Sequence, residues 1–257
     1  MDNVTLTLTA VVLARAGVNR ITPNAAAVLV LACNIPELLI AAVLWQRGVA
    51  LWREAVAAAI GIAVHFAFRY LEGSREVLVS SSPWLIAVLG LCVGAPMLSN
   101  LVGSEIGASK KKSGRGWAYF GVLFLFVWIG GHELMRHRAI ETLNARTYSG
   151  AAPIRTAAWP TQWNPLEWRG YVATDTFWII EPIRLDREFD PEAGCKIFKP
   201  EDADALGRAM ASEKGQAFLR RAKYPIWRIT PPKIEAADAR AARRELCPVF
   251  VTVADAS

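Results

Sequence analysis

The sequence predicts an α-helical membrane domain of about four transmembrane helices, followed by a small soluble α+β domain. Four long apolar stretches fill the front of the chain, at about 25–45, 55–70, 84–102 and 117–131. Each approaches the roughly 20 residues that a helix needs to cross hydrocarbon. No comparable run follows Glu133, where charges of both signs return. We therefore expect a polytopic membrane domain at 1–133, an amphipathic interfacial helix at 134–150 and a soluble domain at 151–257.

The first residues predict a short helix that precedes the spans. Residues 4–16 alternate Thr with Leu and Val, and they are too few to cross a bilayer. We expect an interfacial or re-entrant helix. It is not a signal peptide, because Asp2 stands where such a leader carries a basic residue.

Composition and charge indicate a membrane location. The 257 residues are 53% hydrophobic and 20% charged, with a net charge of +6. Basic residues beside apolar helices typically reflect membrane topology, and no compact basic and aromatic patch predicts a nucleic-acid partner. The loops after the first and third spans hold two more basic residues than the opposite side. The positive-inside rule then places the C-terminal domain in the periplasm of a bacterium, with the spans in the inner membrane.

Two spans carry polar residues that lipid does not favour. The first contains Pro36 and Glu37, and a carboxylate at that depth costs a few kcal/mol. Glu37 is either protonated or hydrogen-bonded to a neighbouring helix, or it is a functional group in a cavity. The second span contains His65, which either bonds across helices or ligates a divalent metal or a tetrapyrrole cofactor.

The soluble domain reads as short strands, turns and one or two helices. Two β-rich runs at 169–173 and 177–184 predict a hairpin with its turn near 174–176. A further turn and a short strand are expected within FDPEAGCKIFKP, and one or two helices within 201–222. We expect PIWRIT and CPVFVTV to form the closing strands. Cys195 and Cys247 would pair in an oxidising compartment, and free thiols are the expected state.

Motifs that carry chemistry are few. His132 and His137 are five residues apart, so they do not share a helical face, and we expect both at the membrane interface. The sequence has no H-E-x-x-H motif, no G-x-S-x-G elbow and no phosphate-binding loop. The acidic residues around Pro191 predict a solvated turn, with weak calcium binding as the alternative.

Several segments together resemble a known family. They are MDNVTLTLTAVVLARAG, LVGSEIGASKKKSGRGWAYF, ARTYSGAAPIRTAAWPTQWNPLEWRGYVAT, FDPEAGCKIFKPE and AFLRRAKYPIWRIT. The chain resembles the bacterial inner-membrane metal-dependent hydrolase family, which is related to the LexA-binding inner-membrane proteins. The resemblance covers most of the chain and implies a polytopic inner-membrane protein with a metal-dependent hydrolase site.

The metal-binding motifs of that family are altered here. Leu6 stands at the histidine of its T-H-T motif, and Pro36-Glu37-Leu38-Leu39 stands for P-D-x-D. Its H-R-G-x-T-H-S motif aligns best with a stretch that begins at Trp52, where Glu54 is the single acid. A further stretch with His and Asp is missing, and Ser82-Pro83-Trp84 stands for D-P-W. The resemblance thus implies a divergent member, with Glu37 and Glu54 as the remaining metal candidates.

These observations favour a non-catalytic accessory or scaffold subunit of a larger membrane complex, whose partners are lipids and other membrane subunits. The interface residues we expect are aromatic: Trp117, Phe120, Phe124, Trp128, Trp159, Trp163 and Trp168. The first alternative is a membrane-bound metal-dependent hydrolase with a reduced site at Glu37 and Glu54, aided by His65. The second is a haem- or chlorophyll-ligating subunit of an energy-converting complex that uses His65.

Overall fold

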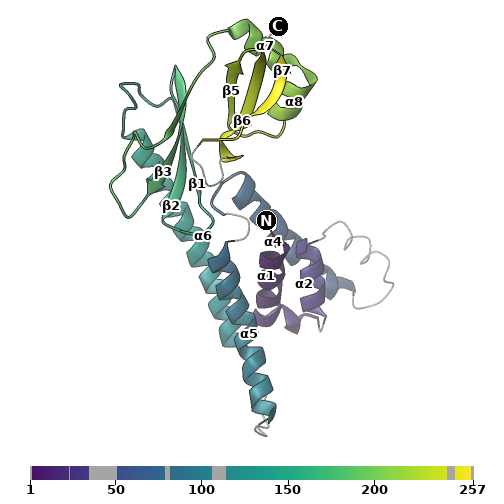
Figure 1. The fold of residues 1–257 in the computed structure, drawn as a ribbon. Coiled ribbons are helices and arrows are strands. Elements are labelled where there is room, and N and C mark those ends of the chain that lie inside the picture. The colour runs from purple at the N-terminus through teal and green to yellow at the C-terminus, as the bar shows by residue number, and fades with distance from the viewer. Residues whose placement is uncertain are drawn as a thin grey trace. The chain divides into compact units, whose positions relative to one another are not determined.

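A computed structural model describes residues 2–22, 24–34, 51–78, 82–105, 114–241 and 247–255, with backbone alone for Leu51, Trp52 and Glu54. The chain forms two compact units (Figure 1). The helical unit contains Met1–Leu134 and Pro160–Pro165, and the sheet unit contains Met135–Trp159 and Leu166–Ser257. Each unit is described separately below.

Helices form all the regular structure described in the helical unit. In chain order they are α1 (Asn3–Ala16), the 3-10 turn η1 (Val18–Arg20), α2 (Ala25–Asn34), α4 (Leu51–Gly73), α5 (Pro83–Glu105) and α6 (Arg115–Asn144). Three stretches are long and apolar enough to cross a membrane: Ala55–Gly73, Pro83–Glu105 and Arg115–Asn144. They correspond to the second, third and fourth predicted spans. Of the first predicted span, only α2 lies within the described residues, so four spans are not confirmed.

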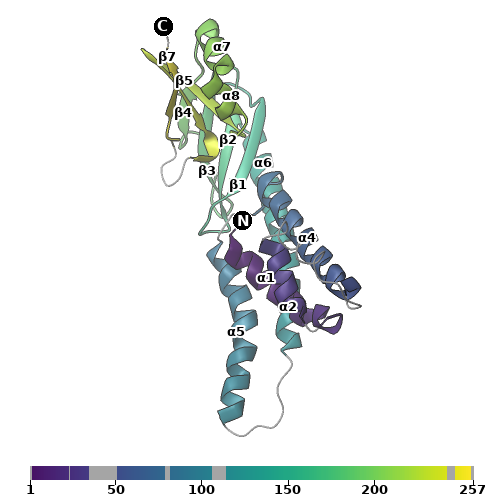
Figure 2. The ribbon, with the colours of Figure 1, turned by 90° about the vertical axis from the view of Figure 1, so that its right-hand side faces the viewer.

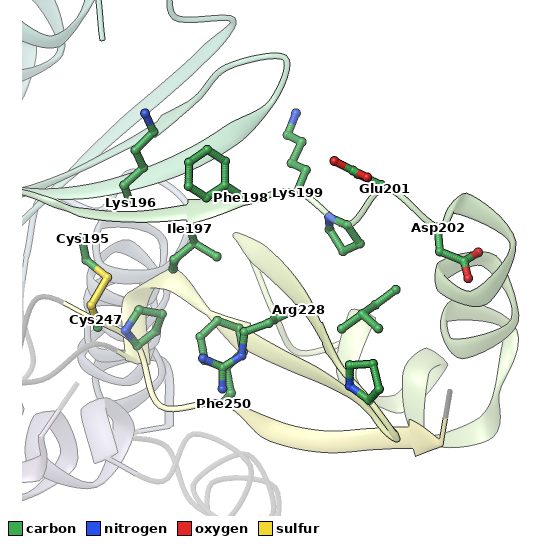
Figure 3. A pocket seen from close by; sticks show the side chains of 14 residues that line it. Cys195, Lys196, Ile197, Phe198, Lys199, Glu201, Asp202, Arg228, Cys247 and Phe250 are labelled. Atoms are coloured by element: carbon green, nitrogen blue, oxygen red, sulfur yellow. A yellow bond between two sulfur atoms is a disulfide. The ribbon is translucent and has the colours of Figure 1, made fainter. Parts of the chain in front are cut away.

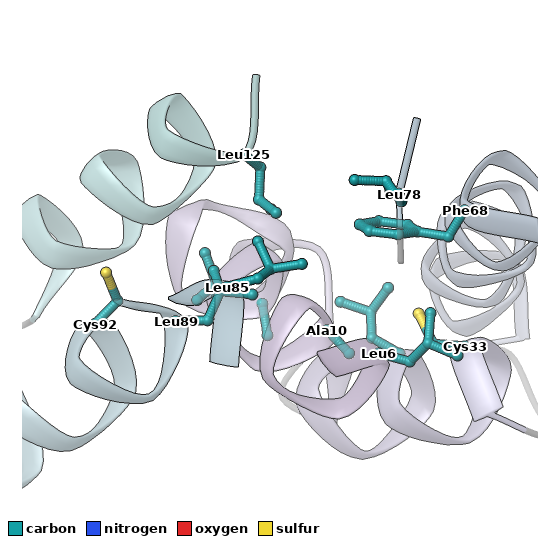
Figure 4. Packing of buried hydrophobic residues seen from close by; sticks show 12 residues of the cluster. Leu6, Ala10, Cys33, Phe68, Leu78, Leu85, Leu89, Cys92 and Leu125 are labelled. Atoms are coloured by element: carbon teal, nitrogen blue, oxygen red, sulfur yellow. The ribbon is translucent and has the colours of Figure 1, made fainter. Parts of the chain in front are cut away.

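Helix α1 packs inside the helical unit, between α2 and α5 (Figures 1 and 2). The Asp2 carboxylate caps its first turn and accepts the backbone N–H of Thr5 at 2.8 Å. Leu6 and Ala10 are 3% and 0% exposed, and they join an apolar cluster with residues of α2, α4, α5 and α6 (Figure 4). The predicted short helix is therefore present, and its neighbours cover it on two sides.

The close approach of α2 to α4 depends on Gly61. A Cβ at this position would overlap the Cβ of Ala32, and it would lie 3.3 Å from the Leu29 carbonyl oxygen. The Cys33 thiol lies 3.4 Å from the Gly61 carbonyl oxygen across the same contact. Small residues let helices pack backbone to backbone in this way.

Replacing Gly61 by valine is expected to destabilise the helical unit. The added side chain has no space against Ala32, and overpacking of this kind costs roughly 1–3 kcal/mol. Thermal unfolding of the full chain in detergent measures the effect. Gly90→Val in α5 is the matched control, because a Cβ there meets nothing within 4 Å. Equal losses of stability for both variants would contradict the close α2–α4 contact.

The sheet unit contains two antiparallel sheets. The first has the order β1-β2-β3-β4 and the second β5-β6-β7. The strands are β1 (Arg155–Pro160), β2 (Glu167–Ala173), β3 (Phe177–Arg184), β4 (Cys195–Phe198), β5 (Pro225–Thr230), β6 (Lys233–Asp238) and β7 (Val251–Asp255). Helices α7 (Ala203–Ala211) and α8 (Glu213–Leu219) lie between β4 and β5 in the chain, and the 3-10 turn η2 (Ala239–Ala241) follows β6.

The strands and helices of the sheet unit form layers, because alternate residues of each strand belong to apolar clusters on opposite faces of its sheet. Trp168 and Ile179 share a cluster with Leu143 near the end of α6, on one face of the first sheet. Ile180 packs on the opposite face against Ile226 of the second sheet. The far face of the second sheet packs on α7 and α8. The order is therefore helix, sheet, sheet, helices, with β4 at an edge of the first sheet and β5 at an edge of the second.

The structure confirms a helical part followed by a small region of sheets, and most predicted strands are present. The hairpin of β2 and β3 pairs Ala173 with Trp178, as the turn near 174–176 requires. The strand after the acidic turn is β4, the predicted helices are α7 and α8, and the closing strands are β5 and β7. The interfacial helix expected at 134–150 corresponds to the end of α6, which continues without a break to Asn144 and ends there.

Candidate functional site

The predicted ligand His65 lies on α4 and joins it to α2. Its Nδ1 is 2.6 Å from the carbonyl oxygen of Cys33. Beside it, the Asn34 amide donates to Thr7 Oγ1 at 3.1 Å and to the Val30 carbonyl at 2.8 Å. A polar cluster thus links α1, α2 and α4, and hydrogen bonds between helices are the ordinary use of polar residues in an apolar bundle. When Nδ1 carries the proton and donates it to this carbonyl, Nε2 is the ring nitrogen with a free lone pair, and so the atom that could bind a metal.

The structure does not describe the side chains of the two acids proposed as metal ligands. Glu37 lies outside the described residues, and only the backbone of Glu54 is described, in the first turn of α4. Within the described parts of the chain, no group of three or more His, Cys, Asp or Glu side chains is arranged to hold a metal ion. Asn34 Oδ1 is buried and has no hydrogen-bond partner among the described residues.

The two histidines of α6 differ in their surroundings. His132, expected at an interface, is only 6% exposed; its Nδ1 lies 3.0 Å from the Val77 carbonyl, and its ring lies 4.6 Å from that of Trp128. His137 is exposed and lies 3.2 Å from Glu141 one turn later. The segment after α4 therefore covers His132 on this face of α6, and its position at a membrane interface stays a prediction.

The aromatic residues proposed as an interface fall into three groups. Trp117, Phe120 and Trp163 are 41%, 50% and 71% exposed. Phe124, Trp128 and Trp159 are partly buried against apolar clusters. Trp168 is fully buried beneath α6, so it belongs to the core and is inaccessible to a partner. In the helical unit, the indole N–H of Trp84 donates to the backbone carbonyl of Trp163 at 2.8 Å, and this joins the start of α5 to the segment Pro160–Pro165.

A groove of about 780 Å³ runs along β4 in the sheet unit (Figure 3). Eight consecutive residues, 195–202, line one side, and residues of β5 with the segment 247–250 line the other. A disulfide between Cys195 and Cys247, with Cα atoms 5.2 Å apart, closes one end. The expectation of free thiols is therefore wrong, because the fold brings together two cysteines 52 residues apart.

The cations of this groove have different partners. Arg228 pairs with Glu235 at 2.7 Å, and its guanidinium lies 4.1 Å from the centre of the Phe250 ring. Lys196 donates to Ser149 Oγ at 2.9 Å, and Lys199 donates to the carbonyl of Thr174. Both lysines therefore contact neutral oxygens, and neither is paired with a carboxylate among the described residues. Glu201 and Asp202 line the same groove beyond the end of β4, and neither forms an ion pair with Lys196 or Lys199 among the described residues.

Glu181 is an acid enclosed in the sheet unit. It points from β3 to the face covered by α6; its side chain is 0% exposed, and neither carboxylate oxygen has a hydrogen-bond partner among the described residues. Burial, and then the nearby charge of Asp190, raise its pKa to about 8. The pKa of Tyr148 is raised too, by burial and then by the charge of Glu181. The carboxyl is thus mostly protonated at neutral pH.

Sequence reasoning missed both Glu181 and the groove. The signal for Glu181 was an acid in the otherwise apolar run FWIIEPI, and the signal for the groove was the alternation in CKIFK beside a cysteine. No family model matches this chain, and no curated protein or solved structure matches it. The resemblance to the hydrolase family therefore stays a prediction.

Proposed function

We propose that this chain is a non-catalytic accessory or scaffold subunit of a bacterial inner-membrane complex. One contrast carries the proposal. The interior of the helical unit is packed with hydrocarbon, including Leu6, Leu85 and Leu89, whereas the open groove lies on the sheet unit. In a subunit of this kind the membrane part anchors the chain, and exposed surfaces of either part bind the partner.

Exposed apolar side chains on the candidate spans support a membrane-embedded role. On α6 the exposed set is Trp117, Tyr119, Phe120, Leu123, Phe126, Val127 and Leu134. In water such a surface would aggregate, so lipid or a partner helix has to cover it. Aromatic side chains on this helix suit either neighbour.

The disulfide supports a periplasmic location for the sheet unit. Disulfides persist in oxidising compartments such as the periplasm and are rare in the cytosol. The excess of basic residues in the loops after the first and third predicted spans gives the same orientation, if the first predicted span also crosses the membrane. Both arguments support a periplasmic groove, which would meet exported or periplasmic segments of a partner.

The complex can be tested by native mass spectrometry of the tagged full chain in a mild detergent. We expect a particle heavier than the 28.2 kDa chain, with another protein present at fixed stoichiometry. The double variant Trp117→Ala/Phe120→Ala is expected to lose a partner held at α6, because it removes exposed aromatic area. Leu98→Ala on α5, at a side chain 64% exposed, is the control. A homogeneous single chain under these conditions would refute the proposal.

A further inference from the structure

The edge of β4 has backbone groups that no described strand uses. Strand β4 ends its sheet, and it pairs with β3 alone. The N–H of Lys199 donates to the Thr176 carbonyl at 2.9 Å, one step beyond the paired residues. Because hydrogen bonding alternates along an antiparallel ladder, Lys196 and Phe198 direct their N–H and C=O groups away from β3. Within the described residues, Lys196 and Phe198 therefore present unpaired backbone donors and acceptors to the groove side.

The groove follows this edge rather than one face of the sheet. The Ile197 side chain packs with the cluster between the two sheets, whereas Lys196 Nζ lies 3.9 Å from the centre of the Phe177 ring, on the opposite face. Both residues nevertheless line the groove, together with Phe198. These are consecutive residues, and their side chains point to opposite faces of the sheet. A cavity that touches all of them lies along the backbone of the strand (Figure 3).

The two sides of the edge differ in chemistry. Toward the second sheet, the groove is lined by the apolar residues Ile197, Ile229 and Phe250, together with Lys199 and the Glu235-paired Arg228. On the other side stand Lys196 and Phe198, and Phe198 is 67% exposed. A strand added here would alternate its side chains between these surroundings, and opposite charges on neighbouring strands attract.

We propose that the β4 edge binds an extended, acidic segment of a partner protein by strand addition. Its backbone would pair with Lys196 and Phe198, its apolar side chains would lie on the side of Ile197, and its carboxylates would lie on the side of Lys196. The lysines also favour a partner over a second copy of this chain, because two such edges would bring like charges together. This inference rests on the proposed function and gives the chemical class of the partner.

A defined peptide tests the edge directly in the detergent-purified full chain. The probe is a fluorescent, N-acetylated Glu-Val-Glu-Val-Glu-Val amide, read by anisotropy. The block peptide Glu-Glu-Glu-Val-Val-Val has the same charge, and an alternately N-methylated copy lacks half of the donors. We expect the alternating peptide to bind about tenfold or more tightly than either control, because only it pairs its backbone and matches both surroundings. Equal binding of the alternating and block peptides would refute strand addition.

Variants locate the binding at β4. Phe198→Pro removes an N–H that faces the groove and leaves the pairing with β3 intact, since proline is tolerated at a free strand edge. Phe198→Ala keeps that N–H and is the control. We expect Phe198→Pro, and separately Lys196→Gln, to weaken the binding of the alternating peptide about tenfold or more, with an unchanged thermal transition. Unchanged binding by Phe198→Pro would overturn the proposal.

The same variants separate this inference from the proposed function. A partner that co-purifies with the wild-type chain and equally with Phe198→Pro would keep the scaffold role and exclude the β4 edge as its site. A dimer of this chain that Phe198→Pro dissociates would assign the edge to a second copy, against the proposal. Release of the partner by Phe198→Pro, but not by Phe198→Ala, would support both.

Discussion

Replacing Glu181 by glutamine is expected to remove most of the pH dependence of the sheet unit's stability between about pH 5 and pH 8. The carboxyl has an ordinary pKa of 4.5 and a pKa of about 8 in the fold. Between these values the folded state binds more protons than the unfolded state, so the free energy of unfolding falls as pH rises. The contribution is fully present below the unfolded pKa and is lost as pH passes through the folded pKa. The slope within the window is at most about 1.4 kcal/mol per pH unit.

Denaturant titrations of the full chain, followed by tryptophan fluorescence from pH 5 to pH 8.5, measure this dependence. Asp190→Asn is the matched control: it keeps the ionisable group and removes the charge that helps to raise its pKa. In the Asp190→Asn variant the free energy of unfolding should still fall as pH rises, and the fall should be complete at a lower pH than in the wild-type chain. If the wild-type chain and Glu181→Gln have the same pH profile, Glu181 is not the buried acid described here.

The spans were predictable because length and apolar composition determine whether a helix crosses a bilayer. Pro83–Glu105 extends its predicted run, 84–102, by four residues, whereas Arg115–Asn144 continues 13 residues past its predicted run, 117–131. The place of α1 was not predictable in the same way. Its mixture of Thr and Leu is compatible with a membrane surface, and only the contacts of Thr5 and Leu6 show that its neighbours bury it.

The sheet unit shows which strands leave a local signal. Strands β2 and β3 are rich in aromatic and β-branched residues and flank a short polar turn, so their hairpin was predictable. Strand β6, KIEAAD, was not predicted, because alanine and acidic residues are depleted in strands. It forms a strand because it pairs with β5 on one side and β7 on the other, which is a tertiary effect.

The candidate sites depended on partners distant in sequence. Glu181 is enclosed because Gly194, thirteen positions later, has no side chain; a Cβ there would overlap the Glu181 Cγ. His65 was found from sequence as an isolated polar residue, whereas its bond to Cys33 was not. The groove exists because β4 ends one sheet and β5 the other, and the order of strands is not encoded in any single segment.

Removing the disulfide is expected to give the largest loss of stability in the sheet unit. The Cys195–Cys247 bond closes a loop with a sequence separation of 52 residues. By the chain-entropy argument a loop of this length stabilises the fold by up to about 4 kcal/mol, and native disulfides in small domains contribute roughly 2–5 kcal/mol. Cys247→Ala should therefore unfold at much lower denaturant concentration. It should also weaken the alternating peptide, because the bond holds one end of the groove.

Reductant provides an independent check on the same bond. The wild-type chain with dithiothreitol should match Cys247→Ala, and the variant itself should not respond. Cys92→Ala, at a buried free thiol of the helical unit, should keep the wild-type response to reductant. Without reductant, the denatured wild-type chain should titrate as two free thiols of its four cysteines. Four free thiols, with stability insensitive to dithiothreitol, would show that the bond does not form, and would remove one of the two arguments for a periplasmic sheet unit.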